Sequence, residues 1–493
     1  MTLTWDELAQ ALGVAGGGEA LTLQPPQGRT ALTPQPPRPL AGEGQARSAR
    51  VRAASVAQEG AGAFSSFPLT SVSTDTRTLE PGALFVALQS AANDGHVFVP
   101  QAVSKGAAAL VVSQEVNAPE GMPILRVPDT EIAYGQIARW WRDKFAVPVV
   151  GVTGSVGKTT TKEMVAATLA PLGPILKTMA SQNNETGVPK ALLQLDESHR
   201  AAIIEMGMRG RGQIAYLCNI ARPTVGVITT IGENHLELLG TREAIADAKG
   251  ELLEALPPDG LAVLNQDDPY YAHLRAKTRA HTAAYGFAEG ADYQAQDAIQ
   301  TEDGWRFTVR GVRVTIQSPS RHDVGNALAA LAVACELGVA LADAAGALAA
   351  YVPPPMRMQI TQTLWGGVVL NDAYNAAPAS MRSALQTLAQ QPGGRKWAFL
   401  GDMKELGALG PDAHKELGAI IDGLGGLHGL YTVGELAALI PGAQGRFADS
   451  RAAAEAVPSM PFAPGDVILI KGSRAMAMER IALALMKHGD ICS

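Results

Sequence analysis

The sequence contains little cysteine. Only Cys218, Cys335 and Cys492 occur among its 493 residues. They lie far apart and form no Cys-x-x-Cys pair, so the pattern indicates neither a disulfide framework nor a zinc cluster. A reducing cytoplasm is therefore the expected compartment.

Long apolar runs and a strong positive charge are also absent. No run of about 18–20 apolar residues occurs, so we expect no membrane insertion. Residues 1–13 lack the basic segment and apolar run of a secretory signal, and their spacing predicts a short amphipathic helix. The net charge of −7 gives no basic balance of the kind that nucleic-acid-binding proteins show.

Residues 16–66 are poor in aromatic residues and rich in proline, glycine, glutamine and alanine. Phe64 and Phe67 are the only aromatic residues near this stretch, and both lie at its far edge. Such a composition cannot bury enough apolar surface to offset the entropy lost on ordering. We predict a disordered insertion; its length disfavours the alternative of an ordinary surface loop.

The rest of the chain alternates short apolar runs with helical stretches, which is typical of an α/β protein with parallel sheets. At roughly 100–200 residues per domain, the length allows about three domains. We place them at residues 1–146, 147–354 and 355–493. We expect strands at residues 83–88, 107–112, 148–152, 201–204, 224–228, 261–264, 367–370, 396–400, 429–433 and 467–470, and helices at residues 99–105, 159–169 and 323–337.

A glycine-rich loop between the apolar run 148–152 and a helix is the strongest local signal. It reads Gly154-Ser155-Val156-Gly157-Lys158-Thr159-Thr160. Glycines let backbone N–H groups approach phosphate oxygens, and the helix N-terminus adds partial positive charge. Lys158 can reach the β- and γ-phosphates, and Thr159 can hold Mg²⁺. The common pattern needs glycine where this chain has Val152, so this is a variant loop; a chance glycine turn is the weaker alternative.

Polar residues follow the next strands at the edge of the sheet where nucleotide sites form. Glu205 suits Mg²⁺, but it can also be a solvated acid at a strand end. His235 follows the next strand, and a lone histidine is usually structural. Lys249 on the following helix has an ordinary helical alternative. Asn265 can either read an adenine edge or cap the next helix, and the residues leave both readings open.

Together these pieces resemble the Mur ligases, the ATP-dependent amino-acid ligases of peptidoglycan synthesis, from about residue 69 to 479. The resemblance rests on the phosphate loop, on His235 with Lys249 fourteen places later, on Asn265-x-Asp267-Asp268 and on His322-x-x-x-Asn326. It implies a central P-loop ATPase domain with a parallel sheet. A uridine-nucleotide-binding α/β domain would precede it, and a Rossmann-like α/β domain would follow.

Within the family, five stretches resemble the branch that adds a dipeptide. They are residues 183–189, 205–210, 372–376, 401–407 and 471–474. This implies an enzyme that joins D-alanyl-D-alanine to UDP-N-acetylmuramoyl-tripeptide through an acyl phosphate. We separately expect a monomer. Alternatives are another Mur-type or folylpolyglutamate-type ligase, or a nucleotide-gated binding protein with weak ATPase activity.

The resemblance also implies the residues of the site. Catalytic roles fall to Lys158, Glu205, His235 and Lys249. ATP would bind Gly154, Ser155, Val156, Gly157, Lys158, Thr159, Thr160, Asn265, Arg357, Asp372 and Asn375. The UDP substrate would contact Ser73, Asp75, Arg77, Asn183 and Asn184. Two Mg²⁺ ions would be held by Thr159, Glu205, His235 and Lys249, the last as a carbamate.

The chain departs from the family pattern at Thr230, Met356, Asn371 and Ala377. The family often has asparagine at the first of these positions and glycine at the second. None of the four departures removes a residue expected to bind metal or phosphate.

Overall fold

The computed structural model describes residues 3–13, 68–90, 93–179, 182–233, 235–301, 303–404, 406–425 and 427–488. The insertion predicted at residues 16–66 lies outside these ranges. The chain forms two compact units, Met1–Val149 with Leu176–Arg222, and Val150–Ile175 with Pro223–Ser493. The domain boundaries at residues 146 and 354 stay a prediction.

The first unit begins with the short helix that residues 1–13 predict, α1 (Trp5–Ala11). Thr4 caps it: the Glu7 N–H donates to the Thr4 hydroxyl, and the Thr4 N–H donates to the Glu7 carboxylate. Strand β1 (Leu3–Thr4) pairs antiparallel with β2 (Pro68–Leu69), so residues 3 and 69 lie opposite each other.

A four-stranded parallel sheet follows in the same unit. Its order is β3 (Val72–Ser73), β4 (Leu84–Val86), β5 (Ala109–Val112) and β6 (Ile124–Arg126). Helix α3 (Val99–Ser104) agrees with the prediction, as do β4 and β5. Helix α4 (Thr130–Arg142) packs against α6 (Gly187–Leu192) and α7 (Gln213–Ala221). The unit also contains β8 (Ile175–Lys177) and β9 (Ala201–Glu205).

The second unit starts with a parallel sheet. Five consecutive members of a seven-stranded sheet belong here, in the order β13 (Tyr293–Gln294), β12 (His281–Gly286), β11 (Leu261–Asn265), β10 (Val225–Ile228) and β7 (Val149–Thr153). β9 and β8 are the other two members. The strands predicted at residues 148–152, 224–228 and 261–264 are confirmed.

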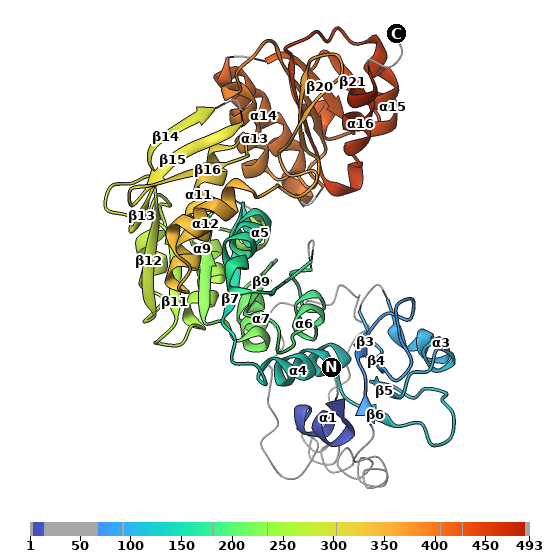
Figure 1. Ribbon diagram of the computed structural model, residues 1–493. Coiled ribbons are helices and arrows are strands. Elements are labelled where there is room, and N and C mark those ends of the chain that lie inside the picture. Colours follow the sequence, from blue (N-terminus) through green and yellow to red (C-terminus); the bar gives the residue numbers. More distant parts are fainter. Residues whose placement is uncertain are drawn as a thin grey trace, which may run out of the picture. The chain divides into compact units, whose positions relative to one another are not determined.

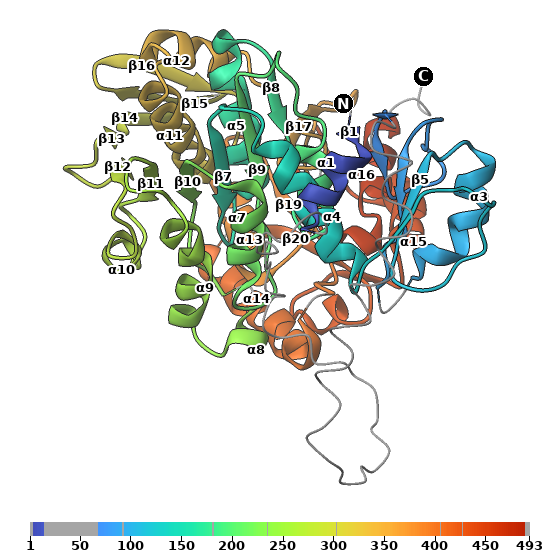
Figure 2. The same cartoon turned by 90° about the horizontal axis from the view of Figure 1, so that it is seen from below.

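Helices pack on this sheet. α5 (Lys158–Leu169) lies against α11 (Arg321–Glu336) and α12 (Leu341–Ala349), as Figure 2 shows. The unit also contains α9 (Arg242–Glu254) and two short helices, α8 (Leu236–Leu239) and α10 (Tyr271–Arg275). A separate antiparallel sheet, which the sequence analysis missed, contains β14 (Gln296–Thr301), β15 (Gly304–Val309) and β16 (Val312–Ile316).

The last part of the second unit is a six-stranded sheet with helices on both faces. Its order is β17 (Gln359–Gln362), β18 (Val368–Asp372), β22 (Val467–Lys471), β19 (Lys396–Gly401), β20 (Leu427–Val433) and β21 (Gly445–Phe447). Only the edge strand β17 is antiparallel. Figure 1 shows α13 (Pro378–Gln390) and α14 (Gly410–Leu424) on one face, and α15 (Ser450–Ala456) and α16 (Glu479–Lys487) on the other. The Rossmann-like α/β fold expected for this part of the chain is confirmed.

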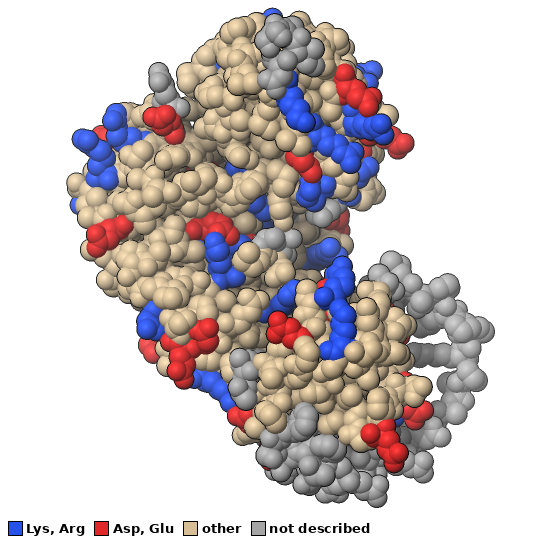
Figure 3. All heavy atoms as spheres, turned by 45° about the vertical axis from the view of Figure 1, so that its right-hand side comes forward, with Lys and Arg blue, Asp and Glu red and all other residues tan. Residues whose placement is uncertain are grey.

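Charged side chains of both signs are scattered among uncharged ones on the face drawn in Figure 3. Within the described ranges, none of the helices combines the length and the apolar character needed to cross a membrane.

Candidate active site

The glycine-rich loop connects β7 to α5 and is held by the chain that follows β10. The Ser155 N–H donates to the Thr230 carbonyl at 2.8 Å, and the Gly232 N–H donates to the Ser155 hydroxyl at 2.8 Å. The Thr229 hydroxyl donates to the Val156 carbonyl at 2.5 Å. These bonds fix the loop to the segment that follows β10.

Two glycines of this loop cannot be replaced without strain. Gly154 and Gly157 have φ values of 147° and 89°, which side chains disfavour. A Cβ on Gly154 would lie 1.9 Å from the Thr229 hydroxyl, and one on Gly157 would lie 2.5 Å from the Asn326 amide oxygen. The backbone at these two glycines is therefore packed closely against Thr229 and Asn326.

Lys158 is the first residue of α5, and its ammonium donates to the Gly154 carbonyl at 2.9 Å. Thr159, which is buried, and Thr160 follow in the same turn. The strand, loop and helix predicted around Lys158 are all present. Phosphate binding by these residues stays a prediction, and the helix N-terminus provides N–H groups suited to it.

Lys249 lies on α9 and is only 3% exposed. Burial, and then the positive charge of Lys158, lowers the pKa of its ammonium well below the usual range. Its neutral amine form is therefore favoured far more than in water. His235 is the N-cap residue that precedes α8, and its backbone is left-handed, φ 65°.

In the first unit, Glu205 ends β9 and is 2% exposed. The Asn183 amide donates to its carboxylate at 2.9 Å, and the Glu205 N–H donates to the Thr178 hydroxyl at 3.0 Å. The Asn184 amide oxygen accepts from the Gly187 N–H at the start of α6. Asn183 thus orients the carboxylate, whereas Asn184 stabilises a helix start; their predicted substrate contacts stay a prediction.

Ser73 ends β3 in the first unit, and Asp75 and Arg77 follow it. The Arg77 guanidinium contacts the Asp75 carboxylate at 2.7 Å and lowers the pKa of that carboxyl to about 2. The Arg77 side chain is still 84% exposed. It is therefore accessible to an anion, and the predicted pyrophosphate contact stays a prediction.

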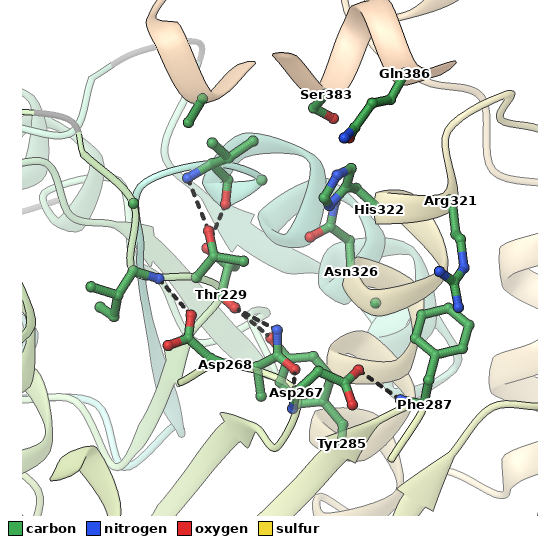
Figure 4. Close-up of a pocket in the computed structure, with 18 of the residues that line it drawn as sticks. Thr229, Asp267, Asp268, Tyr285, Phe287, Arg321, His322, Asn326, Ser383 and Gln386 are labelled. Carbon is green, nitrogen blue, oxygen red and sulfur yellow. Dashed lines mark hydrogen bonds between the residues drawn. The ribbon is translucent and has the colours of Figure 1, made fainter. Parts of the chain in front are cut away.

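A cavity of about 660 Å³ opens beside the glycine loop in the second unit (Figure 4). Of the predicted ATP-binding residues, Val156, Gly157 and Asn265 line it. Arg357, Asp372 and Asn375 are not in its lining. The other lining residues are Thr229, Thr230, Ile231, Gly232, Asp267, Asp268, Pro269, Tyr285, Phe287, Arg321, His322, Gly325, Asn326, Ala379, Ser383, Gln386, Thr387 and Gln390.

Asn265 closes the turn after β11. Its amide donates to the Thr229 carbonyl at 3.2 Å and accepts from the Asp267 N–H at 3.0 Å. Asn265 therefore does not cap the next helix, α10, whose N-cap residue is Tyr270. Asn265 lines the cavity, and its contact with adenine stays a prediction. Asp268 accepts from the Ile231 N–H at 2.7 Å, so it too shapes the cavity wall.

Other residues that line the cavity had no predicted role. Arg321 places its guanidinium 4.2 Å from the Phe287 ring centre, and burial lowers the pKa of His322. Ser383 and Gln386 come from α13 and point toward His322 in Figure 4. His322 carried a signal, as part of His322-x-x-x-Asn326. The α13 residues carried none, because their spacing is that of any polar helix face.

Known protein domains match this chain in three stretches. They are the Mur ligase family catalytic domain at residues 68–167, the Mur ligase middle domain at 152–334 and the Mur ligase glutamate ligase domain at 356–474. The UDP-N-acetylmuramoyl-tripeptide–D-alanyl-D-alanine ligase of Synechocystis sp. is 40% identical over 429 residues, which cover 85% of this chain and 92% of the relative. The chain belongs to the Mur ligase family.

Solved Mur ligase structures agree with this assignment. MurF from Acinetobacter baumannii is 33% identical, with a TM-score of 0.79, over 85% of this chain and 94% of that one. A MurF ligase from Thermotoga maritima, solved in complex with ADP, is 29% identical, with a TM-score of 0.77. The match covers 86% of this chain and 99% of that one. The predicted three-domain α/β Mur ligase fold is confirmed.

Proposed function

We propose that this Mur ligase uses ATP to join D-alanyl-D-alanine to UDP-N-acetylmuramoyl-tripeptide. The observation that carries the proposal is the 40% identity to a ligase of that name over 92% of its length. The glycine loop and its adjoining cavity support it, because a nucleotide needs both a phosphate cradle and a concave base site.

The chemistry requires two anions to meet. The carboxylate of the tripeptide attacks the γ-phosphorus of ATP, ADP leaves, and an acyl phosphate forms. The amine of the dipeptide then attacks the acyl carbon, and inorganic phosphate leaves. Lys158, at the head of α5, would neutralise charge that develops on the phosphate oxygens.

Magnesium fits the residues that the family resemblance assigns to it. Within the described residues, no three His, Cys, Asp or Glu side chains form a ready-made metal cluster. Thr159 and Glu205 supply oxygen donors, and a carbamate on Lys249 would supply two more. We assign two Mg²⁺ ions to these residues and His235. Bound Mg²⁺ would reduce the repulsion between carboxylate and phosphate.

The remaining assignments belong to the two ends of the chain. Ser73, Asp75 and Arg77 would bind the uridine-nucleotide part of the substrate. Arg357, Asp372 and Asn375 would contact ATP by closure of the last part of the chain, which would also exclude water from the acyl phosphate. We expect a monomer that works in the cytoplasm.

Phosphate release in the presence of ATP and UDP-N-acetylmuramoyl-tripeptide tests the proposal. Release should depend on D-alanyl-D-alanine and exceed release with meso-diaminopimelate, L-lysine or D-glutamate. Equal or better use of a single amino acid would assign the chain to another branch. Phosphate release at the same low rate with and without each acceptor would indicate a nucleotide-gated binding protein.

A further inference from the structure

The buried Lys471 lies at the end of β22 and joins two residues that we assign to ATP binding. It is 2% exposed, and its ammonium donates to the Asp372 carboxylate at 2.5 Å and to the Asn375 carbonyl at 2.9 Å. The strand register places Lys471 directly beside Asp372. Both lie at the carboxyl edge of the sheet, where ligands bind in doubly wound folds.

Asp372 also contacts the turn before β17. The Met358 N–H donates to its other carboxylate oxygen at 3.1 Å. The Tyr374 N–H donates to the Met356 carbonyl at 3.1 Å, and the Arg357 guanidinium lies 4.1 Å from the Tyr374 ring centre. Arg357, Asp372 and Asn375 therefore belong to one contact network in which Lys471 is the buried cation.

We propose that Lys471 is a positioning residue for nucleotide binding. It fixes the direction of the Asp372 carboxylate and the path of the backbone at Asn375. Its own ammonium is enclosed by those two oxygens and does not itself contact the nucleotide. The proposal rests on the proposed function, because it takes Asp372 and Asn375 to be nucleotide contacts.

The same sheet offers a matched control. Lys396 is also buried, at 8% exposed, and its ammonium donates to the Pro392 carbonyl at 3.2 Å. It starts β19, whereas Lys471 ends β22, and these strands are parallel neighbours. The two lysines therefore lie at opposite edges of the sheet. Loss of Lys396 removes a buried ammonium without touching the ligand edge.

The experiment compares Lys471→Met with Lys396→Met. We measure kcat/KM for ATP in the complete reaction, ADP affinity by calorimetry, and melting temperature. Lys471→Met should lower kcat/KM and ADP affinity by about tenfold or more, whereas Lys396→Met should leave both within about twofold of the wild type. Equal effects of the two variants on ADP affinity would overturn the proposal.

A double-mutant cycle with Asp372→Ala shows whether Lys471 acts through Asp372. The double variant removes both charges, so it leaves no uncompensated buried ion even if a single variant folds poorly. Lys471→Met should have little further effect in the Asp372→Ala background; a full additive loss would contradict the proposal. If the wild type binds ADP but does not use D-alanyl-D-alanine, the proposed function fails, while the ADP cycle still tests Lys471.

Discussion

Lys249 combines burial with the nearby charge of Lys158, and both lower the pKa of its ammonium. Only the neutral amine adds CO₂, and the resulting carbamate carries oxygen donors that suit Mg²⁺. An ordinary lysine on a helix surface is neither buried nor placed beside another ammonium. The side chain is therefore suited to carbamylation.

The first prediction concerns this residue. Lys249→Ala should be nearly inactive, and acetate should restore part of the rate by occupying the vacated space. Lys249→Arg should gain nothing from acetate, because it keeps a positive charge there. The measurement is turnover with and without acetate, with circular dichroism as the control for folding. Near-normal activity of the alanine variant would show that Lys249 has no role in the reaction.

Met356 is the departure for which the structure gives a clear physical consequence. Its φ is 61°, in the left-handed region that glycine adopts most easily, and the family often has glycine there. A side chain in this conformation costs roughly 1–2 kcal/mol. The departure therefore places a strained residue directly before Arg357.

The second prediction follows from this strain. Met356→Gly should be more stable than Met356→Ala by about 1 kcal/mol, the reverse of the order expected in a helix. Urea unfolding of both variants gives the comparison. If Met356→Ala is the more stable variant, the backbone at this position is not left-handed in the folded protein.

At the scale of elements, the loop after β19 depends on a buried histidine of α14. His414 accepts from the Met403 N–H at 3.0 Å through Nε2, and its Nδ1 lies 2.6 Å from the Gly410 carbonyl. Nε2 can accept this bond only when the ring is neutral. Burial lowers the pKa of His414, although the Gly410 carbonyl and Asp402 oppose that shift and Lys404 adds to it.

The third prediction concerns stability against pH. Below about pH 6.5 the unfolded chain binds a proton at His414 while the folded chain does not, so the free energy of unfolding falls as the pH drops toward the native pKa. His414→Gln can keep both hydrogen bonds without titrating. The wild type should therefore lose more stability than this variant between about pH 6.5 and 5. Urea unfolding measures the free energy of unfolding of both proteins at each pH. The same pH dependence in the wild type and in His414→Gln would refute the role of His414.

Buried parallel strands were predictable because they are continuous apolar runs. The hairpin of β15 and β16 was missed, although it carries a different signal. Trp305, Phe307 and Val309 alternate with polar residues, and Val314 and Ile316 do the same after Arg310-Gly311. Both turn residues have positive φ, which is the conformation of a tight hairpin turn. Period-two alternation about this turn was enough to predict the pair.

At the scale of the whole molecule, the site is only partly predictable. The glycine loop, Glu205, His235 and Lys249 follow strands or lie on helices whose positions the sequence indicates. The sequence does not indicate that α13 forms a wall of the cavity. That wall depends on how α13 packs near α11, and the two helices are distant in the chain. Thr229 and Asp268 likewise act through contacts with loops that sequence spacing cannot place.

The fourth prediction concerns the insertion. The pairing of β1 with β2 places residue 4 beside residue 68, so only α1 and a short return are needed between them. Replacing residues 20–64 by about ten Gly/Ser residues, which reach roughly 17 Å, should leave melting temperature and activity nearly unchanged. A large loss of stability would show that the replaced segment packs on the protein.

The cavity wall formed by α13 has a thermodynamic consequence. Ser383 and Gln386 on one side, with His322 and Asn265 on the other, belong to parts of the chain separated by Pro353, Pro354 and Pro355. A nucleotide held between them would add its binding free energy to the contacts that keep α13 in place. That contribution is RT ln(1 + [L]/Kd), where [L] is the concentration of free nucleotide. The cellular concentration of ATP would therefore set part of the free energy that keeps α13 packed at the cavity.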